Sequence, residues 1–468
     1  MGAKIVYKSK DSECQQICFL HFNQSCGMQL DIHNEWVKQA DKLPWKAWES
    51  QYAALFSGIK GNVAKPCRMV LGSLIIQLRM GFTDRDLVNQ IQQNPYFQYF
   101  IGLEEFQHHP PFAPTLLVEW RKRISVDFII GANDTLSAAA HPNRKSFGLK
   151  TSGTLVATQI CDATVAPQNI RFPQDTSLLN ECREKLEAMI DLLCETYSLV
   201  KPRTYCKVAH KEYLDFAKSK KPSKERIEQT IKSQLSYVRR DLKYVDTLLQ
   251  EDRRLDSRSE ELLPTIRKVY EQQKYMLENK THKVENRIVS ITQPYVRPIV
   301  RGKANKPTEF GAKLHLSIDE RGFGRIEHLS FEAYNEGPLL QQALEAYKYR
   351  TGVYPNRVLV DQLYRTKANI AFCTQNGIRI SGPKLGRPPK DKKIKDKEAK
   401  IAAKDNVDRI QIERFFSTAK RRNGLGLITK KREDTSLSTI AMSIFVTNIF
   451  GSFKLAVEEL EKENEANA

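Results

Sequence analysis

Three acidic residues, far apart in the sequence, have the residue type and the setting that metal-dependent chemistry requires. Asp162 follows the apolar run 155–161, Asp361 follows the short run 357–360, and Glu413 lies in a segment with the apolar spacing of an amphipathic helix. Two strand ends and a helix can converge on one point of an α/β sheet, where three carboxylates need divalent cations to offset their mutual repulsion. The set therefore predicts two-metal phosphodiester chemistry.

The segment around Glu413 places two cations on the same side of the expected helix. Residues at helical spacing form one stripe that contains Arg409, Glu413, Phe416 and Lys420. The two cations can hold phosphates beside a metal-binding carboxylate, and Arg does so with a planar fork. The alternative for this helix alone is an ordinary ion pair between Arg409 and Glu413, which contributes only about 0.3 to 0.5 kcal/mol when exposed.

The elements around these carboxylates predict an α/β fold. Apolar and β-branched residues indicate a strand from Leu155 to Ile160 that leads to Asp162. Residues 319–322 have the composition of a hairpin turn, so we interpret Asp319 as a turn residue and not as a metal ligand. The later elements are expected in the order strand 310–318, strand 325–331, helix 338–349, strand 357–360, helix 364–376 and strand 378–380. Helices and strands that alternate after a hairpin predict a mixed sheet flanked by helices.

The region before this sheet predicts a small all-helical domain over residues 41–130. Apolar residues recur there at helical spacing, Pro66 suits a helix start, and Gly81 suits a helix stop before a capping turn at Thr83. The last helix, 115–124, is expected to end in the basic run Arg121, Lys122 and Arg123. We interpret the domain as helix-turn-helix-like and DNA-binding, although a purely structural helical domain stays open.

Other segments complete the predicted domain organisation. Apolar residues every three or four positions indicate a long helical insertion at 178–290. Residues 384–404 hold nine Lys or Arg against three Asp or Glu, so we expect a mobile basic linker at 383–404. Its Arg387 lies in a Gly-Arg-Pro tract similar to those that bind the DNA minor groove, while a plain solvated linker stays open. The remaining parts are an N-terminal arm at 1–40, a catalytic core at 150–177 and 291–455, and an acidic tail at 456–468.

Composition narrows the class of protein. The chain has 468 residues and a 41% hydrophobic content, enough for two or three domains with a sizeable core. A net charge of +19 implies a polyanionic partner, with nucleic acid favoured over a membrane. No stretch approaches the roughly 20 apolar residues that span a bilayer, so we expect a cytoplasmic, nucleoid-associated protein. Nine cysteines favour reduced thiols, and the spacing in Cys14, Cys18, His21 and Cys26 fits no compact zinc pattern.

Taken together, these motifs resemble those of bacterial insertion-sequence transposases of the RNase H-like DDE type. The resemblance covers roughly residues 60–130 and 155–450. It depends on the segment 158–164 for the first carboxylate, 358–364 with Asn369 for the second, and 409–425 for the third. The helical segment with Asn94-Pro-Tyr-Phe97 and Trp120-Arg121 is similar to the N-terminal domain that often precedes such cores.

The chain departs from the family pattern at two places. The family commonly has Tyr, Arg, Glu and Lys on the last helix, and the Tyr position is Asn406 here. Relatives often have Asp-Lys-Gly-Tyr at the second carboxylate, where this chain has Asp361, Gln362, Leu363 and Tyr364. These changes affect local DNA contacts and turn geometry, but they leave the three carboxylates in place.

The resemblance implies a site and its partners. Asp162, Asp361 and Glu413 would be catalytic and would bind two Mg²⁺ ions, with Mn²⁺ as a substitute. Double-stranded DNA, both element ends and target, is the expected partner, bound by a homodimer. The residues expected to contact DNA are Arg409, Lys420, Arg421, Arg422, Tyr364, Asn369, Arg121, Lys122, Arg123 and Arg387.

We therefore expect a DNA transposase that cuts the ends of its own mobile element and joins them to a target. One alternative is a nuclease that hydrolyses DNA without joining it, because the metal chemistry is shared and only the nucleophile differs. Another is a DNA-binding protein or repressor whose catalytic core has decayed, for which Asn406, Gln362 and Leu363 are the support.

Overall fold

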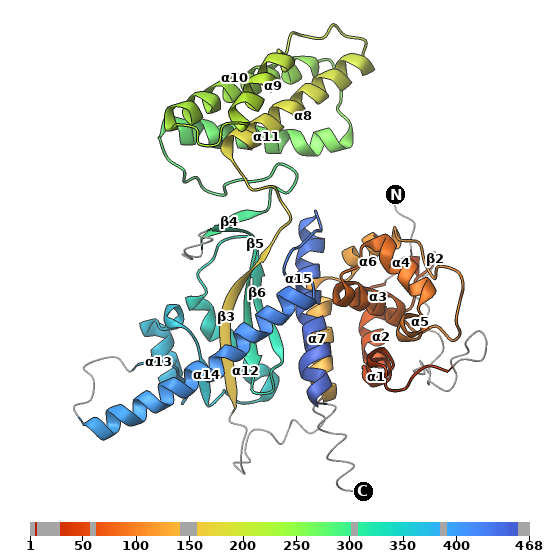
Figure 1. Cartoon of the computed structure of the whole chain (residues 1–468), viewed down its shortest axis with the longest axis vertical. Helices are drawn as coiled ribbons and strands as arrows, with labels where there is room; N and C mark the ends of the chain where they lie inside the picture. Colours follow the sequence, from red (N-terminus) through yellow and green to blue (C-terminus); the bar gives the residue numbers. More distant parts are fainter. Residues whose placement is uncertain are drawn as a thin grey trace. The chain divides into compact units, whose positions relative to one another are not determined.

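The computed structural model describes residues 5–6, 29–56, 62–140, 157–300, 308–383 and 391–456. The chain divides into two compact units (Figure 1). The first contains Met1–Pro167, Lys313–Ser330 and Tyr334–Ala468, and the second contains Gln168–Ala312 with Phe331–Ala333. The mixed α/β class expected from the sequence is confirmed. The cluster Cys14, Cys18, His21 and Cys26 lies outside the described residues, as does Arg387.

The N-terminal part of the first unit is helical, as predicted, apart from two very short strands. The caps are those expected: α3 starts after Pro66, Gly81 ends it in the left-handed region (φ 73°), and the Thr83 side chain caps α4. The elements are β1 (Ile5–Val6), α1 (Glu35–Lys42), α2 (Trp45–Ala53), β2 (Asn62–Val63), α3 (Cys67–Met80), α4 (Asp84–Gln93), α5 (Pro95–Phe100), α6 (Leu116–Arg123) and α7 (Val126–Ala140).

A mixed sheet supports the predicted site. Its strands are β3 (Thr158–Pro167), β4 (Arg297–Val300), β5 (Thr308–Asp319), β6 (Gly324–Ser330), β7 (Arg357–Leu359) and β8 (Arg379–Ile380). The order is β4-β5-β3-β7-β8, with β6 paired to β5. Strands β3, β7 and β8 run parallel, whereas β5 is antiparallel to β4 and β6. The predicted hairpin is confirmed, and the Asp319 carboxylate accepts the backbone N–H groups of Arg321 and Phe323 in its turn.

One strand differs from its prediction. We expected a strand over 155–160 with Asp162 at its end, but β3 continues to Pro167 and Asp162 lies within it. Residues Thr164, Val165 and Ala166 after the carboxylate are small or β-branched and buried, so they extend the strand. A single charged residue therefore does not end a strand when the sequence on both sides suits a sheet.

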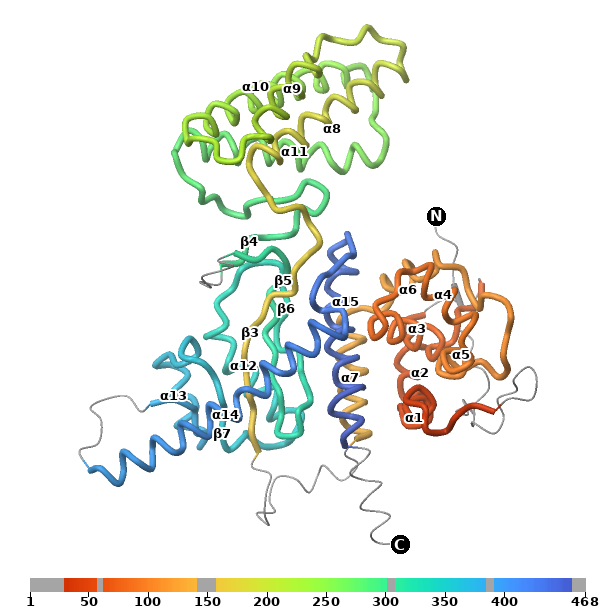
Figure 2. Tube along the Cα trace, in the orientation of Figure 1, coloured from red at the N-terminus to blue at the C-terminus, as the bar shows by residue number. Residues whose placement is uncertain are grey.

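The helices that follow the hairpin lie in the same unit. They are η4 (Gly337–Leu339), α12 (Leu340–Thr351), η5 (Gln362–Tyr364), α13 (Lys367–Gln375), α14 (Lys392–Arg422), α15 (Glu433–Asn448) and the π-helical turn η6 (Ile449–Phe453). Figure 2 shows α14 as a long helix beside β3, which it contacts. The prediction of a mobile linker is wrong for 392–404, which forms the first turns of α14. Ala, Lys and Glu dominate this stretch and favour a helix, and the Asp391 side chain caps its start.

Helices α12 and α14 lie on opposite faces of the sheet. Cys161 of β3 and Val358 of β7 pack in one apolar cluster with Leu344 of α12. Arg357, one residue before Val358, forms an ion pair with Asp408 of α14. Because successive side chains of a strand point to opposite faces, the two helices cover different sides.

Helix α15 joins the parts of the first unit. It contacts α3, α6 and α7 on one side and β6 and α14 on another. Among the described residues, the stretch Glu433–Ala456 is long and apolar enough to cross a membrane, yet 78% of its most apolar window is buried in the protein. The expectation that no stretch approaches such a length is wrong here, and burial in the core explains the apolar composition.

The second unit contains the predicted helical insertion. Its helices are α8 (Asp175–Thr196), α9 (Cys206–Ala217), α10 (Lys224–Leu248) and α11 (Ser257–Glu278). Leu186, Val238, Leu242 and Ile266 belong to a hydrophobic core of its own. Strand β4 pairs with the first residues of β5 in this unit.

Candidate active site

The register of two parallel strands places Asp162 beside Asp361. Strands β3 and β7 pair with Thr158 opposite Arg357 and Ile160 opposite Leu359. Continuing both strands by two more residues puts Asp162 level with Asp361. The backbone of Asp361 is still extended (φ −81°, ψ −178°). Neighbouring strands lie about 4.8 Å apart, so the two carboxylates belong to one local site.

Both carboxylates lie on the α14 face of the sheet. The Nε of Arg357 donates to Thr158 Oγ1 over 2.8 Å, and the same guanidinium reaches Asp408 of α14 at 2.7 Å. Asp162 follows Thr158 by four residues within β3, and Asp361 follows Arg357 by four residues in extended backbone just past β7, so both share this face by alternation. Each Asp also accepts a local backbone N–H, from Ala163 and from Leu363, both at 2.8 Å, and both side chains remain partly exposed.

Helix α14 runs along β3 in the direction of the strand. Near the strand's start, Asp405 is bound by Arg357, and past the helix the Ile428 N–H donates to Pro167 O at the strand's end. Glu413 lies between these two points, beside the buried stripe of Asp405, Ile412 and Ala419. The helix therefore carries Glu413 along the same face of the sheet that holds the two aspartates.

Glu413 is ion-paired with Arg409 at 3.2 Å, and its side chain is 53% exposed. This is the ordinary pair that we left open from the sequence. Within the described ranges, no group of three or more His, Cys, Asp or Glu side chains is close enough to hold a metal ion. The structure thus brings Asp162 and Asp361 together but does not place Glu413 with them.

The donor chemistry of the two aspartates fits a hard divalent cation. Carboxylate oxygens are the ligands that Mg²⁺ and Mn²⁺ prefer. Cys161, the neighbour of Asp162, points to the α12 side, where burial raises the pKa of its thiol and keeps it protonated. The pair can hold a metal and leaves room for ligands from the helix or from a phosphate.

Tyr364 lies beneath the carboxylates and is completely buried. Burial raises the pKa of its hydroxyl far above the usual value, and Cys161, Asp162, Glu336 and Asp361 raise it further. Its ring stacks on His315 at a centroid distance of 5.5 Å, and burial lowers the pKa of His315 to about 4. Both groups are therefore neutral supports of the site at neutral pH.

The structure differs from the predicted DNA contacts at three residues. Tyr364 is buried, and Asn369 is 1% exposed because its Nδ2 donates to Gly337 O and Tyr364 O. Arg121 is also buried, where its guanidinium pairs with Asp84. Tyr364 and Asn369 were expected from the family resemblance, and Arg121 from that resemblance and its basic run; in this structure all three side chains are buried within the protein.

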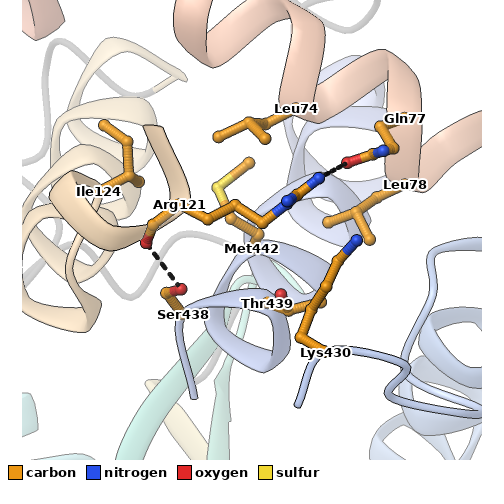
Figure 3. Close-up of a pocket in the computed structure, with 9 residues that line it drawn as sticks. All are labelled: Leu74, Gln77, Leu78, Arg121, Ile124, Lys430, Ser438, Thr439 and Met442. Atoms are coloured by element: carbon orange, nitrogen blue, oxygen red, sulfur yellow. Dashed lines mark hydrogen bonds between the residues drawn. The ribbon is translucent and has the colours of Figure 1, made fainter. Parts of the chain in front are cut away.

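Arg121 lies in a small, largely apolar pocket between the N-terminal helices and α15 (Figure 3). Its guanidinium donates to Gln77 Oε1, and its backbone carbonyl accepts from the hydroxyl of Ser438. Lys430 also lies near Asp84, the ion-pair partner of Arg121, with its Nζ 3.6 Å from Asp84 Oδ1. Burial lowers the pKa of Arg121 and of Lys430, and the negative charge of Asp84 opposes that lowering. Because Asp84 favours the charged form of both residues, the network of ion pairs holds the helices together.

The other predicted DNA-binding residues are accessible in varying degree. Lys122 pairs with Glu119 at 2.8 Å, and Arg123 lies over the ring of Phe56 at 4.5 Å. At the end of α14, Lys420 is half-buried, whereas the remaining two cations, Arg421 and Arg422, are exposed. These residues and Arg409 stay predictions.

A cleft on the α14 face was not predicted from the sequence. It has a volume of about 500 Å³, and its walls include Ile160, Glu320, Arg379, Lys404 and Asp408. In it, Asp405 is 4% exposed and is held by Arg379 at 2.7 Å and by Arg357. Asp405 and Asp408 are three residues apart, which is the helical spacing that indicates a shared face.

Two segments of the chain are similar to known transposase domains. Residues 358–449 match the family described as Transposase DDE domain, and residues 25–123 match the Transposase domain (DUF772). The first match includes Asp361 and Glu413, but Asp162 precedes it. A Rhizobium meliloti protein, "Uncharacterized protein ORF8 in nfe locus", is 28% identical over 142 residues, which cover 30% of this chain and 66% of that protein. No solved structure matches.

Proposed function

We propose that this chain is a DDE-type insertion-sequence transposase with an RNase H-like catalytic core, which cuts the ends of a mobile DNA element and joins them to target DNA. One observation carries the proposal. Extending the register of the parallel strands β3 and β7 by two residues puts Asp162 level with Asp361, on the face along which α14 carries Glu413. Such a set of carboxylates suits phosphodiester chemistry that depends on divalent metal ions.

The residues that would hold the metal ions are Asp162, Asp361 and Glu413. Two Mg²⁺ ions, or Mn²⁺, supply activation of a water molecule or a DNA 3′-hydroxyl and stabilise the departing oxygen when bound at such carboxylates. Glu413 would have to leave its pair with Arg409, which costs little because the pair is partly exposed. Its release would free the Arg409 guanidinium to bind a phosphate with two parallel hydrogen bonds.

The exposed cations near the end of α14 support DNA as the substrate. Arg421 and Arg422 are exposed eight and nine residues beyond Glu413, which is more than two helical turns, and they adjoin Lys420 on the same helix. Positive side chains near a phosphodiester-cleaving site neutralise the polyanion that must enter it. Joining two element ends requires two active sites, so we propose a homodimer on DNA.

The test is metal-dependent cleavage and joining of element-end DNA by single-site variants. Asp162→Asn, Asp361→Asn and Glu413→Gln should each abolish Mg²⁺-dependent cleavage while duplex binding remains. Asp396→Asn is the matched control, since it removes an exposed carboxylate from α14 outside the site and should keep full activity. Normal strand transfer by Glu413→Gln would refute the assignment of that residue.

The products separate the proposal from its alternatives. Strand-transfer products identify a transposase, whereas cleavage without joined products identifies a nuclease. Binding of DNA by the unmodified chain with no metal-dependent cleavage would favour a decayed DNA-binding protein.

A further inference from the structure

We propose that the outer face of α9 in the second unit binds the phosphate backbone of duplex DNA. This inference rests on the proposed function, because it assigns part of the same DNA substrate to the helical insertion. We define the α9 basic face as Arg203, Lys207, Lys211, Lys218, Lys220 and Lys221.

Charge is distributed very unevenly within the second unit. Residues 201–226, which include α9, contain nine Lys or Arg and three Asp or Glu, a net charge of +6. Helix α8 contains two Lys or Arg and six Asp or Glu, a net charge of −4, and α11 contains four of each. Residues 201–226 are therefore far more positively charged than α8 or α11 of the same unit.

The cations of α9 form an ordered stripe. Lys207, Lys211 and Lys218 lie at offsets of 0, 4 and 11, so they share one side of the helix. The buried residues Ala209 and Tyr213 lie on the opposite side, against the bundle. The stripe extends about 16 Å along the helix axis, a length over which a duplex presents roughly ten phosphates at about 1.7 Å per charge.

The cations of this face are exposed and available. All six are exposed, and within the described residues none of them forms an ion pair with a carboxylate. The acidic Glu212 of α9 accepts a hydrogen bond from the Tyr237 hydroxyl at 3.0 Å and is thereby directed to α10. Cations on ordinary solvated helices commonly pair with nearby acids, as Lys232 does with Glu228 at 2.6 Å on α10.

An exposed aromatic residue adjoins the stripe. Tyr205 is 44% exposed, and its ring centroid lies 4.5 Å from the guanidinium carbon of Arg203 and 5.4 Å from that of Arg240. Its backbone is in the left-handed region (φ 55°), which is costly for a residue other than glycine. An aromatic ring among cations offers contacts to sugar and base edges next to phosphates, so the face suits nucleic acid better than an acidic protein.

The experiment measures how binding of the full chain to a labelled duplex of arbitrary sequence depends on salt, without divalent metal. The test variant Lys207→Gln/Lys211→Gln/Lys218→Gln removes three charges from the α9 basic face. The control variant Arg258→Gln/Lys268→Gln/Lys274→Gln removes three exposed charges from α11 in the same unit. All substitutions are at exposed helical positions, and thermal unfolding verifies that both variants fold.

The expected result is a change in the test variant alone. Each lost phosphate contact lowers the slope of log K against log salt by about 0.9, so the test variant should lose two to three in slope, roughly ten-fold or more in affinity at moderate salt. Equal slopes for the two variants would overturn the inference, as would a change in self-association without a change in DNA binding. Failure of the unmodified chain to bind any duplex would instead refute the proposed function.

Discussion

The two faces of the catalytic sheet are built from alternate residues of the same strands, and they differ in chemistry. On the α12 face, Cys161, Val358 and Val360 lie in an apolar cluster that encloses the Tyr364 ring. On the α14 face, Asp162 and Asp361 stand partly exposed. The comparison teaches that one face supports the strands while the other presents polar groups, so substitutions one residue apart should have opposite consequences.

The largest expected effect separates neighbours in β3. Asp162→Asn should lower the cleavage rate by about 10³-fold or more, which is about 4 kcal/mol of transition-state stabilisation, because it removes a proposed metal ligand. Cys161→Ala should retain activity and lower the free energy of unfolding by roughly 1 kcal/mol, since it removes only a small buried group. Rates and urea unfolding of both variants check this. Equal loss of activity in the two would abolish the distinction between the faces.

The next effect concerns the attachment of α14 to its face. Asp405→Ala should lower the free energy of unfolding by about 3 to 4 kcal/mol, because it leaves Arg357 and Arg379 without their buried partner. Arg379 is 43% exposed, so the loss should fall at the lower end of the range for buried pairs. Urea unfolding gives the value, and Asp396→Asn on the same helix should cost less than about 0.5 kcal/mol. Equal values would show that the buried pair does not hold the helix.

A smaller effect should appear as a pH dependence from the α12 side. Burial lowers the pKa of His315 from 6.5 to about 4, so the unfolded chain takes up a proton first as the pH falls. Stability from this residue is complete above about pH 6.5 and is lost between that value and about pH 4, by roughly 2 to 3 kcal/mol. Unfolding of the parent and of His315→Gln across this range provides the test. An identical pH dependence for both would show that His315 is not the titrating group.

The smallest effect concerns the Tyr364 hydroxyl. It is buried with no hydrogen-bond partner among the described residues, so its removal in Tyr364→Phe sacrifices no bond. We expect the free energy of unfolding to stay the same or rise by up to about 1 kcal/mol, with activity unchanged. A large loss of cleavage in this variant would instead give the hydroxyl a part in the site.

Much of the architecture was predictable because local signals are strong. The caps at Pro66, Gly81 and Thr83 and the hairpin turn at Asp319 follow from the conformational preferences of single residues. The end of β3 and the start of α14 were not predictable in this way. The charges of Asp162 and of residues 392–404 suggested breaks at these places, but packing and helix propensity override them. Boundaries depend on such competition between signals.

The sequence by itself determined the mixed α/β class, an aspartate in or just after each of two strands, the helix that carries Glu413 and the positive charge that predicts a polyanionic partner. Only the tertiary structure decided that Asp162 is level with Asp361 and that Arg121, Tyr364 and Asn369 are buried. The physical reason is range. Propensity and periodicity act over a few residues, whereas register and burial depend on contacts between segments hundreds of residues apart.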